Sequence, residues 1–119
     1  MKYGSYYSVT LKESIGKGRG VFTEEEIPAG ALVLVEPVLI LSDFEQMESN
    51  ALLDYLFQMG DLKGVSLGIG TFSNHSDNPN MQVKRLVDEE RSEFYALRDI
   101  AIGEELTHKY VRKLWFSPA

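Results

Sequence analysis

A glycine-rich run near the start of the chain, residues 16–22, can bring backbone amides close to a bound molecule. Its sequence is GKGRGVF, with glycine at positions 16, 18 and 20. Alternating glycines let a backbone approach a ligand without side-chain clash. The run is not a phosphate loop, because it lacks the G-x-x-x-x-G-K-[ST] spacing and no helical pattern follows it. Taken alone, it favours a hairpin turn over a binding loop.

A second candidate lies in residues 68–80, with the sequence GIGTFSNHSDNPN. Its short polar side chains can hydrogen-bond to nearby backbone and hold an irregular loop. No metal site is expected, because the chain has only two histidines, His75 and His108, and a calcium-loop spacing with its terminal Glu is absent. A structural loop and a functional loop both fit this segment.

A third candidate is residues 103–110, with the sequence GEELTHKY. Glu104 and Glu105 are adjacent carboxylates, which suggests acid and base chemistry. Neighbours in a strand point to opposite faces, however, and cannot share a proton. A solvated turn explains the pair better, and Tyr110 taken alone is more typical of a core aromatic than of a catalyst.

The elements that must position these segments are mostly short strands. Runs rich in β-branched and aromatic residues, punctuated by glycine, predict strands rather than long helices. Tight turns are predicted at residues 27–30 and 102–105, and a solvated hairpin tip at 88–91. The predicted strands are residues 8–11, 20–23, 31–35, 38–41, 81–87 and 94–97.

One segment predicts a helical insertion. Residues 42–45 fit a capping box, in which the Ser42 hydroxyl and the Glu45 carboxylate satisfy backbone amides reciprocally. An apolar stripe follows between Leu52 and Met59, and Gly60 suits a helix end. The polar residues between Glu45 and this stripe leave one helix or two open.

Composition narrows the function classes. The chain has 119 residues, no Cys, 12 Lys and Arg against 18 Asp and Glu, and a formal charge of −6. This charge argues against direct nucleic-acid binding, which needs a basic face, and favours a cationic partner. Without Cys there is no disulfide and no Cys-ligated zinc. The longest apolar run, residues 31–41, is too short for a membrane span, so we expect a soluble intracellular protein with no membrane contact.

The three candidate segments together resemble the SET-domain family of protein lysine methyltransferases. The first motif of the family is similar to residues 18–22, its next turn and strand to residues 27–36, and its N-H-S-x-x-P-N motif to residues 74–80. The closing motif is similar to residues 96–110, with G-E-E-L-T at 103–107 and the tyrosine at 110. In its short length the chain looks most like the minimal viral SET histone methyltransferases.

The resemblance implies a mostly β fold. This is the SET domain, or β-clip, of small curved sheets with a knot-like C-terminal crossing and a short helical insertion. The whole chain, residues 1–119, would be a single SET domain in which residues 111–119 form a short C-terminal flank. The crossing would bring Asn74 and His75 beside Tyr110. Chain threading is rare enough that sequence physics alone does not predict it.

The resemblance also implies S-adenosyl-L-methionine as the cofactor. Its binding residues would be Lys17, Gly18, Arg19, Gly20, Asn74, His75, Tyr110 and Trp115. In this arrangement His75 is structural rather than a general base. Trp115 is similar to the aromatic residue of the family that covers the adenine, a contact for which stacking is suitable.

The substrate lysine would enter from the opposite face through a channel that ends at the catalytic Tyr110. The channel residues implied are Tyr55, Phe72, His108 and Leu114. Only the neutral amine can attack, and a dry channel beside a sulfonium charge disfavours the ammonium form, so no dedicated base is needed.

Three positions depart from the family pattern. Pro37 stands where many members have a channel tyrosine, His108 where Phe or Tyr is common, and Leu114 where viral members have tyrosine. The leading prediction is therefore a protein-lysine N-methyltransferase acting on a basic protein substrate such as a histone tail, in the nucleus or a host nucleus. The alternative is a catalytically impaired SET module that binds cofactor or peptide. A homodimer, as in the viral members, also stays open.

Overall fold

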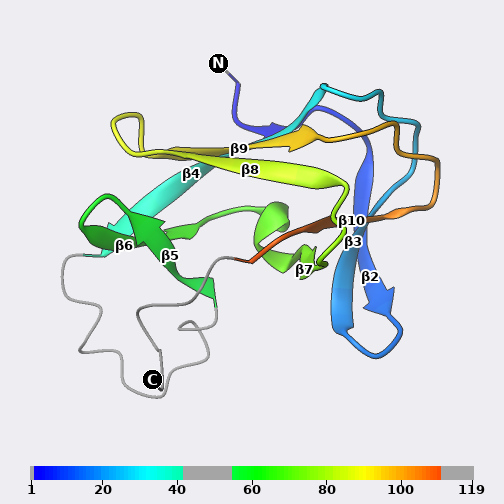
Figure 1. Cartoon of the computed structure of the whole chain (residues 1–119), viewed down its shortest axis with the longest axis horizontal. Helices are drawn as coiled ribbons and strands as arrows, with labels where there is room; N and C mark the ends of the chain where they lie inside the picture. The colour runs from blue at the N-terminus through cyan, green and yellow to red at the C-terminus, as the bar shows by residue number, and fades with distance from the viewer. Residues whose placement is uncertain (1, 42–54, 111–119) are drawn as a thin grey trace.

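Short strands arranged in two sheets make up just over half of the described residues (Figure 1). The structure is a computed structural model that describes residues 2–41 and 55–110. The elements are β1 (Gly4–Ser5), β2 (Val9–Ser14), β3 (Gly18–Thr23), β4 (Leu32–Leu41), β5 (Phe57–Met59), β6 (Leu62–Ser66), the 3-10 helix η3 (Ile69–Phe72), β7 (Asn74–His75), β8 (Met81–Leu86), β9 (Arg91–Ala96) and β10 (Glu105–His108).

The larger sheet is organised around the long strand β4. Its order is β5-β6-β4-β9-β8, with β1 also paired to β4, and every described pairing in it is antiparallel. The first part of β4 pairs with β9 as far as Pro37, and from Val38 onward β4 pairs with β6. Proline has no backbone N–H to donate, so the change of partner falls where the chain lacks a donor. The two strands predicted at 31–35 and 38–41 are therefore one continuous strand.

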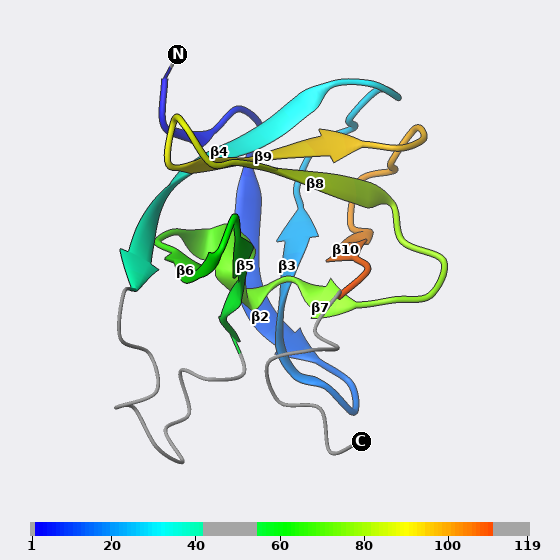
Figure 2. The ribbon, with the colours of Figure 1, turned by 60° about the vertical axis from the view of Figure 1, so that its left-hand side comes forward.

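The second sheet joins distant parts of the sequence in the order β2-β3-β10-β7. β2 and β3 form a hairpin, and β10 pairs antiparallel with β3. On its other side β10 pairs parallel with β7. Seen from the side, β2 and β3 run across the direction of β4, β8 and β9 (Figure 2). Among the described residues, this sheet is where all three candidate segments meet.

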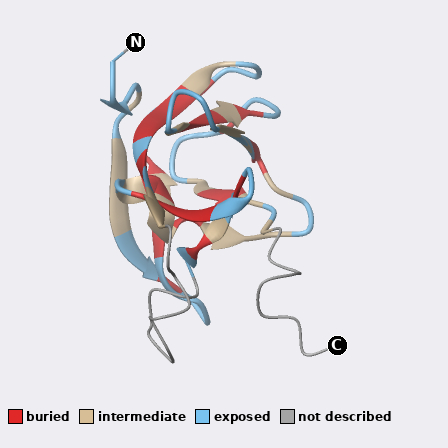
Figure 3. Ribbon diagram, turned by 90° about the vertical axis from the view of Figure 1, so that its left-hand side faces the viewer, coloured by how far each residue is buried: buried red, intermediate tan, exposed pale blue. Residues whose placement is uncertain are grey.

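The core lies between the two sheets. Buried segments run along the facing strands, whereas the hairpin tips are exposed (Figure 3). Complete burial of a side chain such as Phe94 stabilises the fold by roughly 1.5–3 kcal/mol. The core cluster consists of Val21, Ile27, Val33, Leu34, Met81, Phe94, Ala96, Ile100 and Leu106.

Most of the predicted local structure is confirmed. Strands occupy the predicted runs, an antiparallel bridge joins Ile27 to Ile100, and residues 88–90 form an exposed hairpin tip. The mostly β architecture is also as expected. None of the helical segments in the described part of the chain has the length and hydrophobicity that crossing a bilayer requires.

The predicted helical insertion is wrong at its C-terminal end. Residues 57–59 form β5, which pairs with β6, and Gly60 has φ 62° in the turn between them. Gly60 therefore serves a hairpin turn, which needs positive φ, rather than a helix end. Residues 42–54, where the rest of the helix was predicted, lie outside the described residues.

Candidate functional site

The parallel pairing of β7 with β10 brings the second and third candidate segments together. Thr107 lies opposite Asn74, and His108 lies opposite His75. The backbone N–H of Tyr110 donates to His75 Nδ1 at 2.9 Å, and the two rings are 5.2 Å apart. The other ring nitrogen of His75 lies 3.0 Å from Asp77. Nδ1 of His75 therefore ties the loop to the segment that follows β10, and Nε2 contacts Asp77 within the loop itself.

Asn74 connects this pair of strands to the glycine-rich run. Its side-chain amide donates to the backbone carbonyl of Arg19 at 3.0 Å and to the Glu105 carboxylate at 2.7 Å. Glu105 also accepts a hydrogen bond from the Ser14 hydroxyl at 2.9 Å and lies 3.9 Å from the ammonium group of Lys17. The three candidate segments thus meet at one carboxylate.

This arrangement corrects the prediction that both acidic residues belong to a solvated turn. Glu104 does lie at the turn, where it accepts from the Ala101 backbone N–H at 2.7 Å and pairs with Arg98. That backbone hydrogen bond, followed by the one from Arg98, lowers the pKa of Glu104. Glu105 is instead in β10 and its side chain is only 17% exposed. The two carboxylates have separate partners, as expected for neighbours at the start of a strand.

Gly20 is required by the close approach of these groups. A Cβ at this position would lie 2.9 Å from the Asn74 side-chain nitrogen and closer still to the Glu105 carboxylate. Gly20 itself is buried, whereas Lys17, Gly18 and Arg19 are exposed, so the accessible backbone beside the Glu105 carboxylate is that of residues 17–19. These features fit the cationic cofactor S-adenosylmethionine, which the sequence predicted for Lys17, Gly18, Arg19, Gly20, Asn74 and His75. Among the described residues no cluster suits a metal ion.

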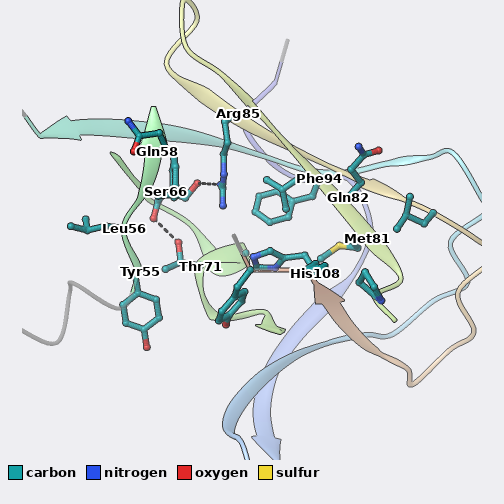
Figure 4. A pocket seen from close by; sticks show the side chains of 17 residues that line it. Tyr55, Leu56, Gln58, Ser66, Thr71, Met81, Gln82, Arg85, Phe94 and His108 are labelled. Carbon is teal, nitrogen blue, oxygen red and sulfur yellow. Dashed lines mark hydrogen bonds between the residues drawn. The ribbon is translucent and has the colours of Figure 1, made fainter. Parts of the chain in front are cut away.

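Tyr110 borders a cavity of about 570 Å³. Its hydroxyl donates to the backbone carbonyl of Ser73 at 2.9 Å. Tyr55, Thr71, Phe94 and His108 also line this cavity (Figure 4). The cavity therefore lies between the two sheets, with its walls contributed by both.

His108 is held in one orientation and is uncharged. Its Nδ1 lies 2.8 Å from the Ser73 hydroxyl, which lies 2.7 Å from the Gly70 carbonyl. A hydroxyl has one proton to donate, so donation to Gly70 makes His108 Nδ1 the donor to Ser73. The unprotonated nitrogen is then Nε2, as assigned from the hydrogen-bond network. Burial, followed by the charges of Arg85 and His75, lowers the pKa of His108 to about 4.

Arg85 is a cavity residue that the sequence analysis did not identify. Its guanidinium donates to the Ser92 hydroxyl at 2.7 Å and lies 3.6 Å from the Phe57 ring centroid. A usable signal existed, since Met81 and Val83 alternate with polar residues and place Arg85 on the same face of β8. Because charged side chains are rarely buried, a cation on the apolar face of an alternating strand indicates a role other than hydrophobic packing.

Glu36 is a second buried group that the sequence analysis did not assign a role. It is 2% exposed, and its Oε2 accepts from the Gly70 backbone N–H at 2.6 Å. Among residues 2–41 and 55–110, its Oε1 has no hydrogen-bond partner of suitable geometry. Burial raises the pKa of this carboxyl, against the lowering effect of the Gly70 N–H.

The remaining predicted channel residues are placed differently from one another. Tyr55 lines the cavity, whereas Phe72 is absent from the cavity walls. Phe72 instead contacts the Tyr55 ring edge-on at 6.1 Å and lies beneath the guanidinium of Arg19 at 4.7 Å. Phe72 thus joins the cavity wall to the glycine-rich run. Leu114 and Trp115, with the predicted flank 111–119, lie outside the described residues.

Comparisons with known proteins agree with this geometry. Residues 18–111 match the SET domain family, and the chain belongs to that family. A Schizosaccharomyces pombe histone-lysine N-methyltransferase specific for H3 lysine-37 is 35% identical over 111 residues, which cover 89% of this chain and 75% of that protein. A Chaetomium globosum histone-lysine N-methyltransferase specific for H3 lysine-4 is 31% identical over 104 residues, which cover 76% of this chain but only 10% of that protein.

Solved structures share the fold. A Plasmodium falciparum protein described as a candidate histone methyltransferase superposes with a TM-score of 0.73, covering 97% of this chain and 99% of that one at 24% identity. A chain of the Chaetomium thermophilum Polycomb Repressive Complex 2 superposes with a TM-score of 0.72, covering 87% of this chain and 15% of that one at 26% identity. The architecture is thus that of SET methyltransferases.

Proposed function

We propose that this chain is a protein-lysine N-methyltransferase that uses S-adenosylmethionine and acts on a basic protein segment such as a histone tail. The observation that carries the proposal is the β7–β10 pairing, which sets Asn74 and His75 beside Tyr110 and the cavity. The cofactor, when bound, supplies a methyl group on a sulfonium. We propose that it is held by Lys17 to Gly20, Asn74, His75 and Trp115, the last of which lies outside the described residues.

In this proposal Tyr110 orients the substrate amine. Its hydroxyl donates to the Ser73 carbonyl, and because a phenolic oxygen is also an acceptor, we propose that an N–H of the amine donates to it in the bound complex. The in-line transfer needs nitrogen, carbon and sulfur nearly collinear, so a fixed acceptor at the channel end is of direct use. Tyr55, His108 and Leu114 are proposed as walls of the channel, and Phe72 as support for Tyr55.

The amine must be neutral to react. Starting from a pKa of about 10.4, its deprotonation at pH 7 costs roughly 4 to 5 kcal/mol. An enclosed site disfavours the ammonium form and offsets part of this cost. His108, whose pKa is lowered to about 4, is too weak a base to hold the proton of a lysine ammonium.

Exposed carboxylates support a basic substrate. Residues 24–26 and 88–90 are acidic and exposed, and such charges steer an oppositely charged segment toward a site. The two relatives described above are histone-lysine methyltransferases, so we propose a histone substrate and a nuclear location. The resemblance to minimal viral members and the homodimer stay predictions, and sedimentation equilibrium of the purified chain tests the latter.

The alternative is a SET module that binds cofactor or peptide without transfer. The favouring observation is His108, a buried polar ring where Phe or Tyr is common in the family, together with Pro37 on β4. An enzyme and a binding module differ in whether methyl groups reach a lysine.

The test is incubation of the purified chain with methyl-labelled S-adenosylmethionine, histones and lysine-rich peptides, with products identified by mass spectrometry. Methyl groups on a lysine are expected. The Tyr110→Phe variant should bind the cofactor as tightly as the wild type but turn over at least about 100-fold more slowly, the size of effect typical of a lost transition-state hydrogen bond. Cofactor binding without transfer by the wild type would instead support the binding module, and full activity of Tyr110→Phe would exclude the proposed role of this residue.

A further inference from the structure

Strand β8 presents one cation to each of its faces. Arg85 pairs with Ser92 and faces the cavity, whereas its neighbour Lys84 pairs with Glu93 on the outer face. The Lys84 ammonium accordingly lies 4.8 Å from the ring centroid of Tyr95, which shares that outer face. In Figure 4 the Arg85 side chain reaches from its strand into the cavity, between Ser66 and Phe94. The predicted lysine channel therefore already contains a positive charge.

In the part of the chain that the structure describes, the positive charge on Arg85 is not neutralised by an ion pair. Its Nη1 donates to two neutral hydroxyls, Ser92 at 2.7 Å and Ser66 at 3.4 Å, and its planar group lies on the Phe57 ring. Within residues 2–41 and 55–110, no carboxylate lies within 4.0 Å of its guanidinium nitrogens. Burial lowers the pKa of Arg85 to about 10, against the raising effect of Glu36, so the group stays charged at neutral pH.

The other titratable groups around the cavity do not cancel this charge. Glu36 on β4 has an opposing electrostatic effect that raises the pKa of Arg85, but its Oε2 accepts from the Gly70 backbone N–H rather than from the guanidinium. The remaining described titratable groups around the cavity include no carboxylate. They are Lys63 on β6, His75 on β7, His108 on β10, and Tyr55, Lys109 and Tyr110 in the adjoining segments.

The field of Arg85 reaches the end of the cavity at which Tyr110 lies. The His108 ring is 4.9 Å from the Tyr110 ring and 6.1 Å from the Phe94 ring, and the Arg85 guanidinium is 6.0 Å from that same Phe94 ring. After burial, the charge on Arg85 is the next largest cause that lowers the pKa of His108. A lysine amine beside Tyr110 would experience a field of the same sign.

We propose that Arg85 keeps the bound substrate amine in its neutral, reactive form by disfavouring an ammonium group inside the cavity. The proposal rests on the lysine methyltransferase function proposed above. A cation beside an amine favours loss of the amine proton, and enzymes that need a neutral lysine at pH 7 use a neighbouring cation in this way. Arg85 thus replaces a general base by electrostatics, and the proton leaves to solvent before the amine enters or while it binds.

The proposal makes a kinetic distinction. The pH dependence of kcat reports the amine in the bound complex, whereas kcat/KM refers to free enzyme and free peptide. Removing the charge should raise the apparent pKa seen in kcat, because a cation inside the cavity lowers the pKa of a nearby amine. At the same time kcat/KM at pH 7 should not fall, because the neutral amine gains nothing from Arg85.

The experiment compares Arg85→Met with Arg85→Lys, which keeps the charge, and with Lys84→Met, which removes a charge from the outer face of the same strand. Profiles of kcat and kcat/KM are measured from pH 6 to 9.5 on a lysine peptide methylated by the wild type. Only Arg85→Met should shift the kcat profile. An unshifted profile in Arg85→Met, or an equal fall of kcat and kcat/KM at every pH, would overturn the proposal. Should Arg85→Met not fold, Arg85→Gln removes the same charge and keeps a donor toward Ser92.

A second readout does not depend on activity. The pKa of the His108 ring, followed by nitrogen-15 NMR, should rise in Arg85→Met and keep its wild-type value in Arg85→Lys and Lys84→Met. An unchanged His108 pKa in Arg85→Met overturns the proposal whatever the activity. If the wild type methylates no lysine, the proposed function fails, and the His108 measurement still decides whether Arg85 sets the potential in the cavity.

Discussion

The Gly20→Ala substitution tests whether the three motifs meet as described. The added Cβ would lie 2.9 Å from the Asn74 side-chain nitrogen and closer to the Glu105 carboxylate, so Asn74 must move. Asn74 would then lose its bond to the Arg19 carbonyl and its bond to Glu105. A neutral hydrogen bond contributes about 1 kcal/mol and one to a charged group about 1.5–3 kcal/mol. Together these values predict a loss of roughly 2 to 4 kcal/mol in the free energy of unfolding.

Two measurements check this prediction. Urea unfolding gives the stability, and calorimetry gives the affinity for S-adenosylmethionine, which should weaken by at least about tenfold, equivalent to 1.4 kcal/mol, because Asn74 is displaced. Gly30→Ala is the matched control. Gly30 has φ 84° with open space around its Cβ position, so alanine costs about 1–2 kcal/mol in backbone strain without altering the cofactor affinity. Wild-type stability and affinity in Gly20→Ala would refute the reasoning.

Three further predictions concern the buried polar groups. The His108 pKa falls from 6.5 to about 4 in the fold, so neutral His108 is compatible with the folded state above pH 6.5, and about 3 kcal/mol of stability is lost as the pH falls toward 4. Urea unfolding at pH 7 and 4.5 should therefore show a larger loss of stability at low pH in the wild type than in His108→Phe. Equal pH dependence in the two proteins would contradict this prediction. Burial raises the pKa of Glu36, so its ionisation lowers the stability of the folded state as the pH rises above 4.5. Glu36→Gln should therefore lower the melting temperature less at pH 7 than at pH 4. A larger loss at pH 7 would argue against this account of Glu36. In Ser73→Ala, the His108 ring loses the acceptor of its Nδ1 proton, so nitrogen-15 NMR should show a mixture of tautomers where the wild type shows one.

Local sequence patterns were enough to predict most strands of the larger sheet. Alternating and β-branched residues marked β4, β8 and β9, and glycines marked their turns. The two-residue strands β1 and β7 have no such pattern, because they exist only through pairing with β4 and β10. The error at residues 57–59 has a similar cause. An apolar stripe at helical spacing was overridden by the β5–β6 hairpin, whose pairing is tertiary.

The candidate site could be predicted from motifs but not from physics alone. The spacing of Asn74 and Tyr110 carries no sign that β10 lies parallel to β7, since such pairing depends on the path of the whole chain. Glu105 was assigned to a solvated turn because the adjacent pair Glu104 and Glu105 follows Gly103 within the tight turn predicted at residues 102–105. Its partners, Ser14 and Asn74, come from other strands. The surroundings of Arg85 also come from distant strands, because the cavity that it faces is assembled from both sheets. The sequence analysis therefore overlooked this residue.

The central position of β10 has a consequence for the order of folding. β10 lies between β3 and β7 and is the last described strand of the chain, so a nascent chain that has not yet added residues 105–108 leaves those two strands without their shared partner. Unpaired strand edges are templates for association with other chains, and pairings between residues far apart in sequence form slowly. The steps that complete the site are thus also those that remove the aggregation hazard. Substitutions in β10 should therefore lower soluble yield during synthesis more than equally destabilising substitutions in the β8–β9 hairpin.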